Sequence, residues 1–114
     1  MDTTVRMTLK WSVPPAECRA IASVLQGLMA AAHAEPGCLG CSFSTDMESE
    51  ALVRYVENWK TEGDLVRQLR SEHFTVLAEL MERASQRPLV EFTLAGATRG
   101  LDYVEEVRWA RPHS

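Results

Sequence analysis

Apolar and polar residues alternate strictly near the start of the chain. Between positions 4 and 13 every odd residue is apolar and every even residue is polar. A period of two places the apolar side chains on one face of a strand, so this segment is predicted to be a strand with one face in the core. Pro14 and Pro15 end it, because proline donates no ladder hydrogen bond and its fixed φ suits a helix start.

The period then becomes that of a helix. Over residues 16–34 apolar side chains recur at steps of three and four, which predicts an amphipathic helix that ends at Pro36 and Gly37. Leu39, Cys41 and Phe43 then alternate with small polar residues, which predicts a second strand. The polar, acidic stretch 45–50 is predicted to be a turn.

A third strand is predicted over residues 52–59, and it carries apolar groups on both faces. One face holds Leu52 and Val56, and the other holds Val53, Tyr55 and Trp59. A strand of this kind is covered on both sides. One face is therefore expected to meet the helices, and the other to meet something that this chain does not supply.

The next stretch is predicted to hold two helical segments and a fourth strand. Thr61-Glu62-Gly63-Asp64 resembles a capping box with Asp in place of Glu, and Ser71 is a second candidate N-cap. The second segment runs to Arg87, where Pro88 closes it, and its apolar positions are Phe74, Leu77, Met81 and Ala84. Residues 89–95 alternate again and are predicted to be a strand.

This order predicts one α+β domain over residues 1–95. Strand-helix-strand-strand-helix-strand is the split βαβ arrangement of ferredoxin-like folds, with an antiparallel sheet and both helices on one face. The other face is expected to expose apolar groups, which favours a homodimer that pairs sheet on sheet. Residues 96–114 are interpreted as an arm that packs on the body or on the partner subunit, because Leu101, Tyr103, Val104, Val107 and Trp109 lie among its charges.

Composition narrows the possible partners. The 114 residues carry a net charge of −4, and the basic residues form no block, which argues against a nucleic-acid or anionic membrane surface. No apolar stretch approaches the ~18 residues that span a bilayer. Cys18, Cys38 and Cys41 form an odd set without a disulfide framework, and we see no signal peptide, so a cytoplasmic location with free thiols is expected.

Three motifs in the right order and spacing give the chain a family resemblance. They are Glu35-Pro36-Gly37-Cys38-Leu39-Gly40, Tyr55-Val56-Glu57-Asn58-Trp59 and Leu69-Arg70-Ser71-Glu72-His73-Phe74. Over about residues 5–94 the chain resembles the antibiotic biosynthesis monooxygenase domain family. The resemblance implies a dimeric α+β barrel. It also implies oxidation of phenolic or quinol-type aromatics by molecular oxygen with no cofactor, neither metal nor flavin, although fold alone does not fix function.

By this resemblance, Glu57, Trp59 and His73 are the residues of this chain that match the family's site residues. His73 is the candidate catalytic base, since an imidazole can accept a phenolic proton near neutral pH, and Glu57 would orient it. Tyr55, Trp59 and Gln68 are the candidate substrate-binding residues, with the two aromatic rings stacking on the substrate. The alternative is structural: a hydrogen bond between Glu57 and His73 that stabilises the fold, with Trp59 in the core.

Two differences from the family's residue pattern limit which of the family's reactions are expected of this chain. Many members carry a second histidine where this chain has Gln68, and glutamine cannot act as a base near pH 7. Members of the family's haem-degrading branch resemble one another in having a tryptophan near the position of Gln68 and a histidine about ten residues later. Gln68 and Ala78 stand there, so haem degradation is not expected.

Cys38 and Cys41 have the C-x-x-C spacing of metal and redox sites. A zinc site needs four ligands and the chain has no second pair, so no metal is predicted. A redox pair of the thioredoxin kind would open a helix, whereas this pair enters a strand. We therefore interpret both as structural and keep a redox role as the alternative.

Two hypotheses remain from the sequence. The first is a cofactor-independent, monooxygenase-like enzyme for a small aromatic phenol or quinol. The second is a non-catalytic dimeric domain that binds a small hydrophobic ligand or stabilises an assembly.

Overall fold

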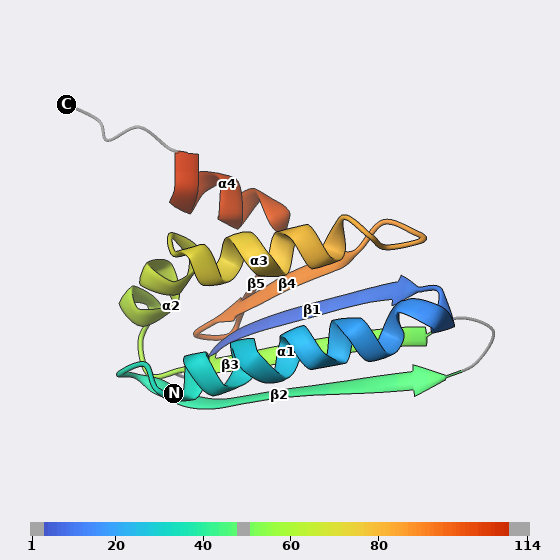
Figure 1. Ribbon diagram of the computed structural model, residues 1–114. Helices are drawn as coiled ribbons and strands as arrows, with labels where there is room; N and C mark the ends of the chain where they lie inside the picture. Colours follow the sequence, from blue (N-terminus) through green and yellow to red (C-terminus); the bar gives the residue numbers. More distant parts are fainter. Residues whose placement is uncertain (1–3, 48–50, 110–114) are drawn as a thin grey trace.

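A computed structural model describes residues 4–47 and 51–109 of the chain (Figure 1). The strands in these ranges are β1 (Val5–Val13), β2 (Cys38–Met47), β3 (Ala51–Trp59), β4 (Leu89–Leu94) and β5 (Ala97–Arg99). The helices are the 3-10 turn η1 (Pro15–Glu17), α1 (Cys18–His33), α2 (Glu62–Leu69), α3 (Glu72–Met81) and α4 (Leu101–Trp109). None of these helices is long and apolar enough to cross a membrane.

The strands form one antiparallel sheet in the order β2-β3-β1-β4-β5. Helices α1 and α3 lie over the same face of this sheet (Figure 1). The first four strands and their crossovers have the predicted split βαβ order, so the α+β, ferredoxin-like prediction is confirmed. The short β5 adds a strand beside β4 that the sequence pattern did not predict.

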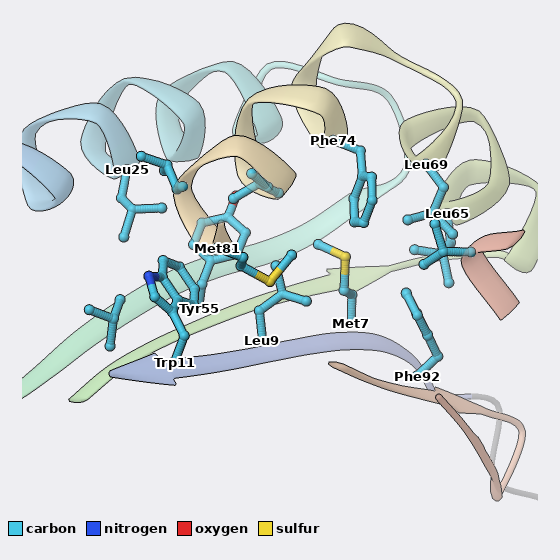
Figure 2. Close-up of a cluster of buried hydrophobic side chains, with 14 of the residues drawn as sticks. Met7, Leu9, Trp11, Leu25, Tyr55, Leu65, Leu69, Phe74, Met81 and Phe92 are labelled. Carbon is cyan, nitrogen blue, oxygen red and sulfur yellow. The ribbon is translucent and has the colours of Figure 1, made fainter. Parts of the chain in front are cut away.

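The alternation at the start of the chain decides which face becomes the core. Met7, Leu9 and Trp11 of β1 point toward the helices and are almost completely buried (Figure 2). Tyr55 lies opposite Leu9, and Phe92 of β4 lies opposite Met7, so both neighbouring strands add side chains to the same face. The helices close this core with Leu25, Leu65, Leu69, Phe74 and Met81.

The other face of the sheet has a mixed character. Leu52 of β3 and Leu89 of β4 flank β1 on this face and are 42% and 47% exposed. Charged and polar side chains alternate with them, including Arg6, Lys10 and Arg54. The expectation of exposed apolar groups on this face therefore holds for Leu52 and Leu89, whereas Val56, the other apolar residue of β3 on this face, is only 5% exposed.

Local signals fix how α2 begins. The Thr61 hydroxyl oxygen accepts the Asp64 backbone N–H at 3.1 Å and donates to Asp64 Oδ2 at 2.8 Å, so the predicted cap is present. Gly37 has φ +86°, and a Cβ at this position would clash with the Asp64 carboxylate. Glycine is required here on two grounds: the left-handed backbone and the close approach of the α2 cap.

Two predicted boundaries are wrong. Residues 45–47, predicted as part of a turn, belong to β2, because Thr45 and Asp46 pair with Val53 and Leu52 of β3. Polar side chains are tolerated there since β2 is an edge strand. The remainder of the predicted turn, 48–50, lies outside the described residues.

The helix predicted to run to Arg87 ends instead at Met81. The Ser85 backbone N–H donates to the carbonyl of Ser12 in β1 at 2.8 Å, a bond that ties the linker between α3 and β4 to the sheet. A long-range backbone hydrogen bond of this kind leaves no trace in the local hydrophobic pattern.

The end of the described chain forms α4, which packs on the body. Tyr103, Val104 and Val107 are buried in the common core. The Tyr103 hydroxyl donates to Glu62 Oε2 at 2.8 Å, and Arg108 donates to the carbonyl of Leu69 at 2.9 Å. These contacts fasten α4 to α2.

Candidate functional site

The carboxylate of Glu57 lies at the centre of the candidate site. Glu57 is in β3, opposite Met7 on one side and Cys41 on the other, and it points to the helix side of the sheet. Its side chain is completely buried. A buried charge is costly unless it is paired and hydrogen-bonded, so its partners determine whether the site is stable.

Both oxygens of this carboxylate have hydrogen-bond donors. The Tyr55 hydroxyl donates to Glu57 Oε2 at 2.6 Å, and the Trp59 indole N–H donates to Oε1 at 3.1 Å. Both partners come from β3 itself, two residues before and after, because alternate side chains of a strand point to the same face. The E-x-W spacing therefore produces this part of the network.

His73 supplies the remaining partner from across the core. It is the second residue of α3, and its Nε2 lies 2.6 Å from Glu57 Oε2. The imidazole side chain is 10% exposed. With Nε2 bonded to the carboxylate, Nδ1 has no partner among the described residues. The arrangement is a carboxylate-oriented imidazole with one free ring nitrogen.

Tyr55 reaches the site through its hydroxyl group. Its ring lies in the core beside Leu9 and Trp11 (Figure 2), and the residue has no exposed surface. Burial raises the pKa of the Tyr55 phenol above its usual value, and the charge of Glu57 raises this pKa further. The phenol therefore stays protonated and donates to the carboxylate.

Cys41 extends the network to the edge strand. Its thiol lies 3.1 Å from the Tyr55 hydroxyl oxygen, to which it donates. Burial raises the pKa of the Cys41 thiol to about 12, with a smaller rise caused by the charge of Glu57 and a lowering by the hydrogen bond to Tyr55. Burial also raises the pKa of Cys38. Neither thiol has the lowered pKa typical of redox-active cysteines.

The raised pKa predicts slow alkylation of Cys41. A thiol becomes nucleophilic only as the thiolate, so Cys41 stays neutral at pH 8 and ionises only as the pH approaches 12. Compared with an ordinary thiol of pKa about 8.5, the thiolate fraction at pH 8 is roughly a thousandfold smaller. Peptide mapping after iodoacetamide treatment, with unfolded protein as control, measures this. Alkylation of native Cys41 as fast as in the unfolded chain would contradict it.

A small cavity adjoins the network at Trp59. Its volume is about 170 Å³, and it is lined by Glu35, Trp59, Asp64, Arg67, Gln68 and Ser71. Gln68, in α2, is 6% exposed, and the Ser71 hydroxyl donates to the backbone carbonyl of Gln68 at 2.6 Å. Two of the three predicted substrate-binding residues, Trp59 and Gln68, thus share one cavity, while the third, Tyr55, lies in the core.

Sequence reasoning did not foresee the contribution of Cys41. Its place opposite Glu57 depends on the register between β2 and β3, which is shifted by a bulge between Cys38 and Gly40. His33, the last residue of α1, also contacts this strand. In the structure its Nε2 accepts the Cys41 backbone N–H at 3.1 Å. The only sequence signal was the alternation of Cys41 with Phe43, which indicated its face.

Metal ligands are not clustered in the described part of the chain. No group of three or more His, Cys, Asp or Glu side chains there could hold a metal ion. The candidate site offers one carboxylate, that of Glu57, and one imidazole, that of His73, and these two groups are hydrogen-bonded to each other.

The chain matches the model of a known family over most of this fold. Residues 4–80 match the antibiotic biosynthesis monooxygenase model. This range contains β1 to β3, α1, α2 and most of α3, and therefore every residue of the Glu57 network. No curated protein has a matching sequence.

Solved structures share the fold at low sequence identity. A conserved protein from Methanosarcina mazei Go1 has 21% identity and a TM-score of 0.70, with 82% of this chain and 93% of that chain covered. PA3566 from Pseudomonas aeruginosa has 25% identity and a TM-score of 0.65, with 82% and 95% covered. A candidate antibiotic biosynthesis monooxygenase from Caulobacter crescentus CB15 has 20% identity and a TM-score of 0.69, with 82% and 91% covered.

Proposed function

Because the chain belongs to the antibiotic biosynthesis monooxygenase family, we propose that it is a cofactor-independent, monooxygenase-like enzyme acting on a small aromatic phenol or quinol. In this proposal His73 is the catalytic base and Glu57 is the group that orients it. The observation that carries the proposal is the 2.6 Å contact between His73 Nε2 and the buried Glu57 carboxylate, which leaves Nδ1 without a partner in the described residues.

The proposed chemistry uses this free nitrogen. When Nε2–H donates to Glu57, Nδ1 carries the lone pair and can accept the phenolic proton. Glu57 then stabilises the imidazolium that forms. The phenolate is more electron-rich than the phenol and reacts with dioxygen. One oxygen atom enters the ring and the other leaves as water, with the substrate as the sole reductant, so a phenol and O₂ give a quinone and H₂O.

The supporting residues have distinct proposed roles. We assign Tyr55 a positioning role, because its hydroxyl holds Glu57 Oε2 at 2.6 Å and its ring is buried. Trp59 holds Oε1 at 3.1 Å and also forms part of the cavity wall, so it links the orienting carboxylate to the space where a ring can bind.

One observation favours a second candidate function. The Glu57 carboxylate has donors on both oxygens and no exposed surface, which is also the geometry of a network that only stabilises a fold. On this alternative the protein is a non-catalytic domain that binds a small hydrophobic ligand or stabilises an assembly.

Oxygen consumption separates the two functions. Purified protein is incubated with a panel of phenols and quinols, and oxygen uptake and quinone formation are followed together. The enzyme proposal expects uptake that depends on protein concentration, with one quinone formed for each O₂, and its loss in a His73 variant. Uptake at the same rate with and without His73 would favour the non-catalytic alternative.

We also propose that the protein is a homodimer that pairs through the open face of the sheet. No element of the described residues covers this face, and Leu52 and Leu89 are exposed on it. Sedimentation equilibrium is expected to give twice the chain mass of 12.8 kDa. Leu52→Arg is expected to shift the mass toward the monomer, while Leu101→Arg, a control on an exposed leucine of α4, should not. A wild-type monomer at micromolar concentration would overturn the proposal.

A further inference from the structure

An open groove where β1 begins and β3 ends is positively charged, although the chain as a whole has a net charge of −4. Its lining residues are Thr4, Val5, Arg6, Leu39, Asn58 and Lys60. Arg6 and Lys60 give the lining two positive charges, and no acidic side chain of the described residues belongs to it. On an acidic protein, such a groove attracts anions.

Neither of these cations has a carboxylate partner. Arg6 and Lys60 form no ion pair with any residue that the structure describes. Glu62 lines an adjoining groove together with Lys60, but its Oε2 accepts the hydroxyl of Tyr103 at 2.8 Å. An anion in the groove would therefore meet two charges that are not already paired.

The polar groups of the groove form an array of hydrogen-bond donors. Arg6 and Asn58 lie directly opposite each other in β1 and β3, and Arg6 Nε donates to Asn58 Oδ1 at 2.8 Å. This bond holds the guanidinium in place. It leaves both terminal nitrogens of Arg6, and Nδ2 of Asn58, without an acceptor among the described residues. With the Lys60 ammonium, which only donates, the array suits a ligand with several acceptor oxygens.

The number of charges and donors favours a phosphate group over a carboxylate. A guanidinium binds either group through two parallel hydrogen bonds, so Arg6 alone would satisfy both oxygens and the single charge of a carboxylate. Lys60 and Asn58 would then have no acceptor. A phosphate monoester carries a charge of about −1.5 to −2 at pH 7 and three acceptor oxygens, and can engage all three residues.

A bulge in β2 adds an apolar side chain to the groove. The register between β2 and β3 shifts between Cys38 and Gly40, so Leu39 is the extra residue, and it is 69% exposed. Bulges commonly redirect a side chain at a sheet edge. The exposed leucine beside the donors fits the organic part of an ester rather than inorganic phosphate alone.

We propose that this groove binds the phosphate monoester of a small organic molecule. Arg6 and Lys60 hold the phosphoryl group, Asn58 fixes Arg6 and donates from Nδ2, and Leu39 contacts the organic part. Arg6 and Asn58 lie on the open face of the sheet, whereas Glu57 points to the helices, so this ligand is distinct from the proposed aromatic substrate.

Calorimetric titration of the full chain with phenyl phosphate and with benzoate at pH 7.5 and 0.15 M salt tests the proposal. Phenyl phosphate is expected to bind at least tenfold more tightly than benzoate, which has the same ring and one charge. Arg6→Gln is expected to weaken phenyl phosphate binding by about 10- to 100-fold, the usual effect of losing charged hydrogen bonds. Leu39→Ser is expected to weaken binding of phenyl phosphate but not of inorganic phosphate.

Two matched variants control for the general loss of positive charge. Arg19→Gln changes an exposed arginine of α1, and Lys10→Gln changes a lysine on the same face of β1 as Arg6, about 13 Å along the strand. Both are expected to bind phenyl phosphate within about twofold of wild type, because charges at that distance are largely screened at this salt concentration. Melting curves for each variant check that it folds.

Three results would overturn the proposal. They are the absence of phenyl phosphate binding to wild type, equal binding by wild type and a folded Arg6→Gln variant, and binding of benzoate as tight as that of phenyl phosphate. None of them depends on oxygen uptake, so the proposal stands or fails independently of the proposed enzymatic function.

Discussion

Glu57→Ala is expected to lower the free energy of unfolding by at least about 3 kcal/mol, because three buried donors lose their acceptor at a cost of about 1–3 kcal/mol each. The carboxylate has no exposed surface, and three side chains direct hydrogen-bonding groups at it: Tyr55, Trp59 and His73. Alanine leaves all three without their acceptor and opens a cavity between β3 and α3. Urea unfolding followed by circular dichroism, at one fixed protein concentration, measures the loss.

Two further variants make this result interpretable. Glu57→Gln keeps the shape and one acceptor oxygen, so a smaller loss than that of alanine is expected. Glu79→Ala removes an exposed carboxylate from α3, with an expected change within about 0.5 kcal/mol. A similar small loss for Glu57→Ala and Glu79→Ala would mean that the network contributes little to stability.

Loss of the base is expected to reduce oxygen uptake with the best quinol by about 10²–10⁴-fold, the usual contribution of a general base. His73→Ala removes the imidazole and leaves Glu57 without a partner, so some of its effect could come from the fold. His73→Gln places an N–H donor near Glu57 Oε2 but offers no base, and it is expected to fold while remaining inactive. Stopped-flow or electrode measurements of oxygen uptake, with melting curves for each variant, separate the two effects.

Two controls test whether the imidazole itself is responsible. His33→Ala changes an exposed histidine that bonds the Cys41 backbone, and its uptake is expected to stay within a few-fold of wild type. Added imidazole is expected to restore part of the activity of His73→Ala, because it supplies a base to the vacated space. Full activity in His73→Gln would remove His73 from the mechanism.

The Glu57 site shows how far local sequence reasoning reaches. The E-x-W spacing placed Tyr55, Glu57 and Trp59 on one face, and the structure agrees, because alternation along a strand is a local property. The approach of His73 to Glu57 was expected from the family resemblance, and the two residues are 16 positions apart, in α3 and β3. That Tyr55 would contribute its hydroxyl and bury its ring could not be predicted, since it depends on the helices packed above it.

The pattern of apolar positions determined β1 to β4, α1 to α3, their order and the buried face of the sheet, because periods of two and of about 3.6 are properties of the backbone itself. It predicted neither β5 nor α4. Tertiary structure alone decided the extension of β2 to Met47, the end of α3 at Met81 and the place of Cys41 opposite Glu57. Each of these depends on hydrogen bonds between segments far apart along the chain. Local periodicity carries no information about such pairings.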